Sequence, residues 1–118
     1  MKHIIWDFNG TLLNDTQLSL DVDNNVFEKL GIPAITLDDY RNNMTMPVRD
    51  FYPAVGVDYS VHSYETIARL WLDEFNQKAV GVGLVSGALD AIRFFHSQGR
   101  SQSVLSASYE PSLRKQCE

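Results

Sequence analysis

Two short stretches with the residue types of buried strands lie near opposite ends of this 118-residue chain, and together they constrain its fold most. His3 to Trp6 runs into a turn-forming loop that begins at Asp7, and Gln102 to Leu105 runs into Ser106. A helix lies between the two, and a strand–helix–strand order predicts a parallel pair. Parallel strands share a direction, so both polar loops should lie at one edge of the sheet. In open α/β sheets, this carboxyl edge is where ligands bind.

Helical spacing of apolar residues predicts most of the chain between the two strands. The expected helices are Gln17 to Leu30, a short one opened by Thr36 and ending at Asn42, a second short one from Pro47 to about Gly56, Val61 to Lys78, and Ala88 to Ser97. Asp15 or Thr16 is the predicted cap of the first helix, and Ser60 and Ser86 are the predicted caps of the last two. We expect Val61, Tyr64, Ala68, Trp71 and Phe75 to share one helix face, and Leu89, Ile92 and Phe95 to point inward.

Composition excludes several classes of protein. The net charge of -5, without a cluster of Lys or Arg, argues against a nucleic-acid partner. No apolar run has the length of a membrane span, and the apolar run at the start of the chain is too short for a signal peptide. The single cysteine, Cys117, fits a reducing compartment. These features predict a cytoplasmic protein with no membrane partner.

Three short motifs resemble those of the haloacid dehalogenase (HAD) superfamily. Residues 7–12, Asp-Phe-Asn-Gly-Thr-Leu, resemble its first motif, and residues 104–108, an apolar strand end followed by Ser-Ala-Ser, resemble the second. Residues 84–87, Leu-Val-Ser-Gly, resemble the entry back into the core, with Ser86 in place of the usual proline. The resemblance implies an α/β fold with a partial Rossmann-like parallel sheet and an inserted α-helical cap.

The resemblance also implies a Mg²⁺-dependent phosphatase acting on a small phosphorylated metabolite. Asp7 would be the nucleophile that forms an aspartyl-phosphate, and it would bind Mg²⁺ together with the backbone carbonyl of Asn9. The side chain of Asn9 occupies the second catalytic position. The phosphate would be held by Gly10, Thr11, Ser106 and Ala107. The simpler interpretation of residues 7–10 is an ordinary turn after a strand.

Asn9 departs from the family pattern, because the phosphatases carry an aspartate at this position. That aspartate protonates the leaving oxygen and then activates water, which an amide cannot do. We therefore expect a chain that binds phosphate and Mg²⁺ but turns over slowly or traps the aspartyl-phosphate, and Asn9→Asp should raise the activity. A further hypothesis is that Asn9 deamidates, since the following Gly10 leaves the backbone nitrogen accessible.

The family's later motifs, a lysine and a set of acidic residues, have no counterpart after Ser106. Lys115 is expected to be an exposed helical lysine. These features predict that the chain is a truncated product, or that a missing C-terminal half or a second subunit completes the core. They also predict that the chain alone is inactive.

Residues 14–82 match the position of the helical cap in relatives similar to phosphoglycolate phosphatase and β-phosphoglucomutase. This places the core at residues 1–13 and 83–118, with hinges at Leu13–Asn14 and Gly81–Gly83. Arg41, Arg49 and His62 are the predicted cap residues that could reach a polar substrate, although a solvated surface role is the simpler interpretation for each.

Two alternatives remain at this stage. A phosphonate hydrolase would need a cap lysine for a Schiff base, and Lys29 and Lys78 are the available ones. The other alternative is a non-catalytic protein of the same fold that binds phosphate or a partner, as Asn9 suggests.

Overall fold

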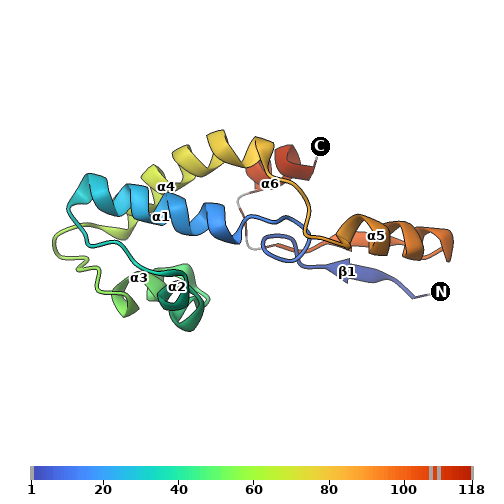
Figure 1. Ribbon diagram of the computed structural model, residues 1–118, viewed down its shortest axis with the longest axis horizontal. Coiled ribbons are helices and arrows are strands. Elements are labelled where there is room, and N and C mark those ends of the chain that lie inside the picture. Colours follow the sequence, from blue (N-terminus) through green and yellow to red (C-terminus); the bar gives the residue numbers. More distant parts are fainter. Residues whose placement is uncertain (1, 107, 109, 118) are drawn as a thin grey trace. The chain divides into compact units, whose positions relative to one another are not determined.

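A computed structural model describes residues 2–106, 108 and 110–117. The elements follow the order β1 (Ile4–Trp6), α1 (Thr16–Leu30), α2 (Leu37–Asn43), η1 (Val48–Asp50), α3 (Phe51–Ala54), α4 (Tyr64–Lys78), η2 (Ala79–Gly81), α5 (Ala88–Ser97), β2 (Gln102–Val104) and α6 (Glu110–Cys117) (Figure 1). The chain divides into two compact units. Unit 1 contains residues 1–16 and 79–118, and unit 2 contains residues 17–78. The sequence-based division placed the boundaries after residues 13 and 82.

Unit 1 is built on a parallel pair of strands, as predicted. β1 and β2 pair in a register that joins Ile4 to Gln102 and Trp6 to Val104. The indole N–H of Trp6 donates to Oε1 of Gln102 at 2.8 Å, and Nε2 of Gln102 donates to the carbonyl of Ile92 on α5 at 3.0 Å. These side-chain bonds tie both strands to the helix that connects them. The fold class is therefore α/β.

The apolar core of unit 1 lies directly beneath the loop that follows β1. Its buried members are Phe8, Leu12, Leu13 and Ala88, and the partly buried Trp6, Val82, Val85, Ile92 and Leu113 pack around them. α5 has the predicted bounds, but Leu89 is 44% exposed, so its predicted inward position is wrong. Ser86 is not the cap of α5. The N-cap position belongs to Gly87, which has φ +84° and provides no side-chain bond.

Two segments of unit 1 that are far apart in the chain are hydrogen-bonded to each other. The N–H of Asn14 donates to the carbonyl of Gly83 at 2.9 Å, and that of Val85 donates to Leu12 at 2.8 Å. Leu13 and Leu84 form an antiparallel bridge between these bonds. The stretch around Gly83, where the sequence analysis placed a hinge, is thus anchored by main-chain pairing. This pairing holds the C-terminal end of the 7–15 segment in place.

Unit 2 is a helical bundle whose core comes from several of its elements. Its fully buried apolar side chains include Val22, Val26, Phe27, Phe51 and Ile67. The short helix α2 begins after Thr36, as predicted, and a capping box joins Thr36 to Asp39. α1 and α4 are joined by a bond of 3.0 Å from Nδ2 of Asn25 to Oε2 of Glu74.

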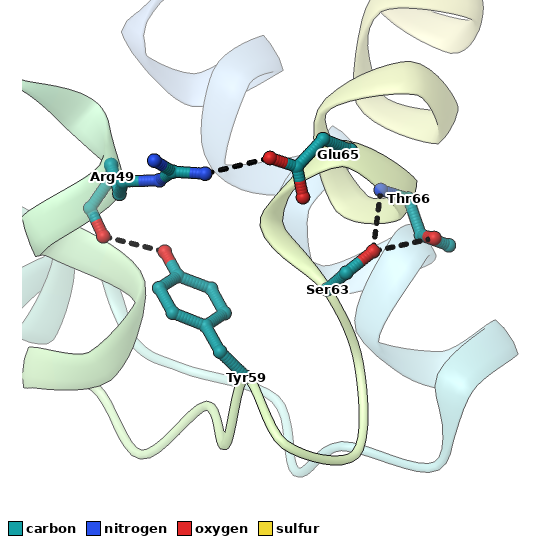
Figure 2. A network of polar contacts seen from close by, with 5 residues as sticks. All are labelled: Arg49, Tyr59, Ser63, Glu65 and Thr66. Atoms are coloured by element: carbon teal, nitrogen blue, oxygen red, sulfur yellow. Dashed lines mark hydrogen bonds and ion pairs between the residues drawn. The ribbon is translucent and has the colours of Figure 1, made fainter.

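The start of α4 differs from the prediction. The helix begins at Tyr64, and Oγ of Ser63 accepts the N–H of Thr66 at 3.2 Å, so Ser63 is the cap (Figure 2). Ser60 instead bonds to Asp58 in the preceding turn. Val61 therefore lies outside the helix and is 68% exposed. The buried face of α4 is formed by Ile67 and Phe75.

Exposed apolar side chains remain on the small sheet of unit 1. Ile5 on β1 is 63% exposed, and Leu105, just after β2, is 71% exposed.

Within the residues that the structure describes, none of the helices has both the length and the apolar character needed to cross a membrane.

Candidate active site

Asp7 is the first residue after β1 and its side chain is exposed. Its Oδ1 accepts the N–H of Phe8 at 3.0 Å, and its Oδ2 accepts the hydroxyl of Thr11 at 3.0 Å. The loop is held from below, because Phe8 and Leu12 are buried in the core while Asp7 and Thr11 stay at the surface. The alternation of apolar anchors and polar groups thus presents a carboxylate and a hydroxyl together at the carboxyl edge of the sheet.

Asn9 joins this loop to the segment after β2. Its Oδ1 accepts the hydroxyl of Ser108 at 2.6 Å and that of Ser106 at 3.3 Å. Ser106 in turn accepts the N–H of Ser108 at 3.1 Å. Asn9 and Ser106 are 97 residues apart in the chain, and the parallel pairing of the two strands brings them together. Ala107, also predicted to bind phosphate, lies outside the described residues.

Asp15 belongs to the same cluster, and sequence reasoning missed it by treating it as a helix cap. It is 2% exposed. Its Oδ2 accepts the amide Nδ2 of Asn9 at 2.6 Å, and its Oδ1 accepts the N–H of Gly10 at 2.7 Å. Burial raises the pKa of Asp15 above its ordinary value, while these two hydrogen bonds lower it and the nearby charge of Asp7 raises it. Its nearness to an Asn-Gly turn was the only signal available in the sequence.

Gly10 contributes its conformation to the site more than its N–H. Its φ is +76°, and a Cβ at this position would lie 3.1 Å from Oγ1 of Thr16. Its N–H is shared between the carbonyl of Leu13, at 2.9 Å, and Asp15. The phosphate contact predicted for Gly10 is therefore not available through this N–H in the present arrangement.

The backbone N–H and carbonyl of Asn9 differ from those of the neighbouring residues. Within the described part of the chain, its N–H donates no hydrogen bond and its carbonyl accepts none, whereas Phe8, Gly10, Thr11 and Leu12 all use their N–H groups. A free N–H is a suitable donor to an anion, and a free carbonyl oxygen is a suitable ligand for a hard cation. Sequence reasoning had identified the carbonyl but not the N–H.

The residues present fit part of a Mg²⁺ site. Magnesium prefers oxygen ligands, keeps several waters and often uses one or two carboxylates. The exposed carboxylate of Asp7 and the free carbonyl of Asn9 are oxygen donors of this kind. No group of three or more His, Cys, Asp or Glu side chains suited to a metal occurs among the described residues. Further ligands would have to be waters, phosphate oxygens or residues from outside this part of the chain.

Of the residues predicted to reach a substrate from residues 14–82, Arg49 has other contacts in unit 2. Figure 2 shows the guanidinium of Arg49 directed at Glu65, with 2.7 Å between Nη2 and Oε1, while the hydroxyl of Tyr59 donates to the Arg49 carbonyl. The same guanidinium lies 5.0 Å from the ring centre of Tyr64. These contacts favour a structural role for Arg49. Arg41 is an exposed residue of α2, and His62 is partly buried before α4.

Lys29 and Lys78 both pair with Glu74. Their Nζ atoms lie 3.8 Å and 3.6 Å from its carboxylate oxygens, and their side chains are 58% and 47% exposed. A Schiff-base lysine is activated by an apolar pocket or by a neighbouring cation. Here both ammonium groups are largely exposed, and both are paired with the carboxylate of Glu74. The structure thus gives no support to the phosphonate hydrolase alternative.

Comparison with known proteins agrees with this geometry. The sequence model of the haloacid dehalogenase-like hydrolases matches residues 4–118, which is nearly the whole chain. The chain belongs to this family. No curated protein matches it.

Solved structures of the family share the fold at low sequence identity. A protein from Lactobacillus delbrueckii subsp. bulgaricus assigned as a phosphoglycolate phosphatase is 18% identical, with a TM-score of 0.75 over 94% of this chain and 56% of its own. A family hydrolase from Deinococcus radiodurans with bound phosphate and sodium is 18% identical, with a TM-score of 0.66 over 97% of this chain and 50% of its own. A Thermotoga maritima protein assigned as a β-phosphoglucomutase is 20% identical, with a TM-score of 0.60 over 98% and 54%. The chain thus spans about half the length of these structures.

Proposed function

We propose that this chain carries the nucleophile-bearing part of a Mg²⁺-dependent phosphatase for small phosphate monoesters. The observation that carries the proposal is the convergence of two distant loops, in which Asn9 bonds to Ser106 beside the exposed carboxylate of Asp7. Family membership supports a hydrolase, and the arrangement supports phosphoryl transfer through Asp7. The complete activity is proposed for an assembled core, because the chain spans about half of its solved relatives.

In the first step, a carboxylate oxygen of Asp7 attacks phosphorus, and the bond from phosphorus to the leaving oxygen breaks. The free N–H of Asn9 and the hydroxyl of Ser106 are the available donors to the phosphate oxygens, whereas the hydroxyl of Thr11 donates to Asp7. Ser106 makes only a long 3.3 Å bond to Asn9, so its hydroxyl can turn toward phosphate with little loss.

Mg²⁺, when bound by the Asp7 carboxylate and the Asn9 carbonyl, would neutralise negative charge on the transferring phosphoryl group. Asp7 also has to be kept from turning away from the substrate. The bonds from Phe8 and Thr11 to its two carboxylate oxygens provide this restraint. The charge of the chain is negative overall, so attraction of a phosphate ester depends on this local site.

The second step, hydrolysis of the aspartyl-phosphate, is expected to be slow. We also expect the alkoxide of an ordinary substrate to be a poor leaving group in the first step. Position 9 holds a carboxamide whose Nδ2 donates to Asp15 and whose Oδ1 accepts two hydroxyls. Such a group neither gives a proton to the leaving oxygen nor takes one from water. Capture of the phosphoryl group on Asp7 without turnover is therefore the expected behaviour of this chain.

The choice of leaving group gives a direct test. p-Nitrophenolate leaves as an anion and needs no proton, so the chain with Mg²⁺ should release about one equivalent of it in a burst before a slow phase. Glycerol phosphate, whose alkoxide needs a proton, should give no burst. Asp7→Asn should abolish the burst, and Asp90→Asn on the exposed face of α5 is the charge-matched control that should keep it. An identical signal from the unsubstituted chain and Asp7→Asn would overturn the proposal.

A second function, phosphate or partner binding without catalysis, is supported by the same fully engaged carboxamide of Asn9. It predicts Mg²⁺-dependent binding of inorganic phosphate, measured by calorimetry, together with the absence of a burst. Loss of phosphate binding in Ser106→Ala would support it. Failure to bind phosphate at all would exclude it for the phosphate ligand.

A further inference from the structure

The bonds between Asn9 and Asp15 define the orientation of the carboxamide at position 9. Asp15 is buried and has no donor of its own when ionised, so its Oδ2 can only accept the hydrogen of Nδ2 of Asn9 across 2.6 Å. Rotation of the carboxamide by half a turn would place Oδ1 of Asn9 against Oδ2 of Asp15. Two acceptors would then face each other with no hydrogen between them. Asp15 thus selects one of the two orientations.

The selected orientation determines what position 9 presents to the rest of the site. Because Nδ2 is taken up by Asp15, Oδ1 points to the hydroxyls of Ser106 and Ser108. Both serines therefore donate toward Asn9. The other oxygen of Asp15 accepts the N–H of Gly10 and so holds the turn that carries Asn9. One buried carboxylate thereby fixes both the backbone and the side chain of the second catalytic position.

We propose that Asp15 is a positioning residue for Asn9, and that the two form a matched carboxylate–amide pair whose members can be exchanged. The proposal deepens the function given above and rests on it for its catalytic consequence. Its structural content stands on the hydrogen bonds of Asp15 alone. It assigns a role to a residue that does not contact the substrate, since Asp15 is buried with both oxygens in use.

The exchange can be followed atom by atom. In the double variant Asn9→Asp/Asp15→Asn, the new amide at position 15 can donate from its nitrogen to the carboxylate at position 9. Its oxygen can accept the N–H of Gly10, as Oδ1 of Asp15 does now. The remaining carboxylate oxygen at position 9 can accept Ser106 and Ser108. Every bond of the present network is kept, and the net charge of the chain is unchanged.

Each single variant, in contrast, breaks the network. Asn9→Asp puts two carboxylate oxygens where Nδ2 and Oδ2 now lie 2.6 Å apart, with no hydrogen between them. Asp15→Asn gives position 15 one donor and one acceptor where two acceptors are needed. With Asn9 in its present orientation, either its Nδ2 or the N–H of Gly10 then faces a second donor, and a carboxamide that turns to avoid this withdraws Oδ1 from Ser106 and Ser108. Both changes therefore break bonds of the buried network.

The first test is a double-mutant cycle for stability of unit 1. The cycle is made in a Trp71→Phe background, so that Trp6 on β1 reports urea unfolding of this unit by fluorescence. Each single variant should raise the ratio of unfolded to folded chain roughly tenfold, the usual result of stranding a buried polar group. The double variant should return to within about threefold of the parent. An additive result, roughly a hundredfold, would overturn the proposal.

The second test uses a readout that a purely structural residue would not change. In the burst assay with p-nitrophenyl phosphate, the slow phase reports loss of phosphate from Asp7. Normalised to folded chain, it should be at least about tenfold faster in the double variant than in Asn9→Asp, because an oriented carboxylate at position 9 can activate water. Equal slow phases in these two variants would show that Asp15 does not position the group at residue 9.

The two tests separate the proposals. Recovery of stability in the double variant without a burst in any variant would support the pairing of Asn9 with Asp15 and refute the phosphatase. A burst that depends on Asp7, together with additive losses of stability, would support the phosphatase and refute the pairing.

Discussion

Asp23 is a buried carboxyl group in unit 2, and its titration should make this unit less stable as the pH rises. The side chain lies on α1, is 2% exposed, and accepts the hydroxyl of Tyr52 on α3 at 2.9 Å. Phe27 meets the ring of Tyr52 edge-on, with 6.0 Å between ring centres. Burial raises the pKa of Asp23 from 3.8 to about 7, and the bond from Tyr52 opposes this by lowering it. Burial is the stronger of the two causes.

The sign follows from proton binding. Between the unfolded pKa of 3.8 and the folded pKa of about 7, the folded chain holds a proton on Asp23 that the unfolded chain has lost. The free energy of unfolding therefore falls as the pH rises through this window. A difference of about three pKa units, at about 1.36 kcal/mol each, corresponds to roughly 4 kcal/mol. For comparison, the free energy of unfolding of a whole domain is typically about 5–15 kcal/mol.

Urea unfolding at a series of pH values measures this effect. In a Trp6→Phe background, fluorescence of Trp71 on α4 reports unit 2, and far-UV circular dichroism provides a second signal. The free energy of unfolding should decline between about pH 4 and about pH 7 and level off above that range. Asp23→Asn should flatten this decline, because its amide oxygen can still accept from Tyr52 but carries no charge. Asp21→Asn, on the same helix but exposed, is the matched control and should leave the slope unchanged.

One outcome would refute the reasoning. If Asp23→Asn kept the full pH dependence of the parent while Asp21→Asn behaved as expected, the buried charge of Asp23 would not be its source.

Three further predictions concern other parts of the chain. Gly10→Ala should destabilise unit 1 by about 1–2 kcal/mol, because Gly10 has a positive φ and an added Cβ would contact Thr16. Gly31→Ala should cost less, because Gly31 has a similar φ of +72° but open space around it. The midpoints of urea unfolding give the comparison. Asp15→Ala should accelerate deamidation of Asn9, because it releases Nδ2 of the carboxamide and removes one of the two acceptors of the Gly10 N–H, the group that the carboxamide must react with. Peptide mass spectrometry would show this, and an unchanged rate would contradict the restraint. Arg49→Ala should reduce the stability of unit 2 by no more than about 1 kcal/mol, because the ion pair of Arg49 with Glu65 is exposed. A larger loss in urea unfolding would contradict this and point to a stronger interaction of the guanidinium with the ring of Tyr64.

Local patterns in the sequence were sufficient for most of the secondary structure. The apolar residues before Asp7 and before Ser106 predicted the two strands, and their order predicted the parallel pairing that the structure shows. α1, α2 and α5 lie within one or two residues of their predicted bounds. These features depend on periodicity and turn chemistry, which act between residues close in the chain.

Errors arose where two local signals competed. Ser60 and Ser63 are both suitable caps for α4, and only the bond of Ser60 to Asp58 in the folded turn decides in favour of Ser63. At α5, a serine before a glycine indicated a cap at Ser86. The backbone instead turns at Gly87, because its positive φ suits glycine.

The sequence alone determined that a carboxylate at Asp7 and a hydroxyl at Ser106 follow two strands of one sheet. Only the tertiary structure decided how they are organised. The side chain of Asp15 is buried and accepts hydrogen bonds from Asn9 and Gly10 instead of capping α1. It thereby holds Asn9 between itself and the two serines after β2. The reason is physical: a carboxylate removed from water must find donors, and the donors that satisfy it are set by packing between segments far apart in the chain.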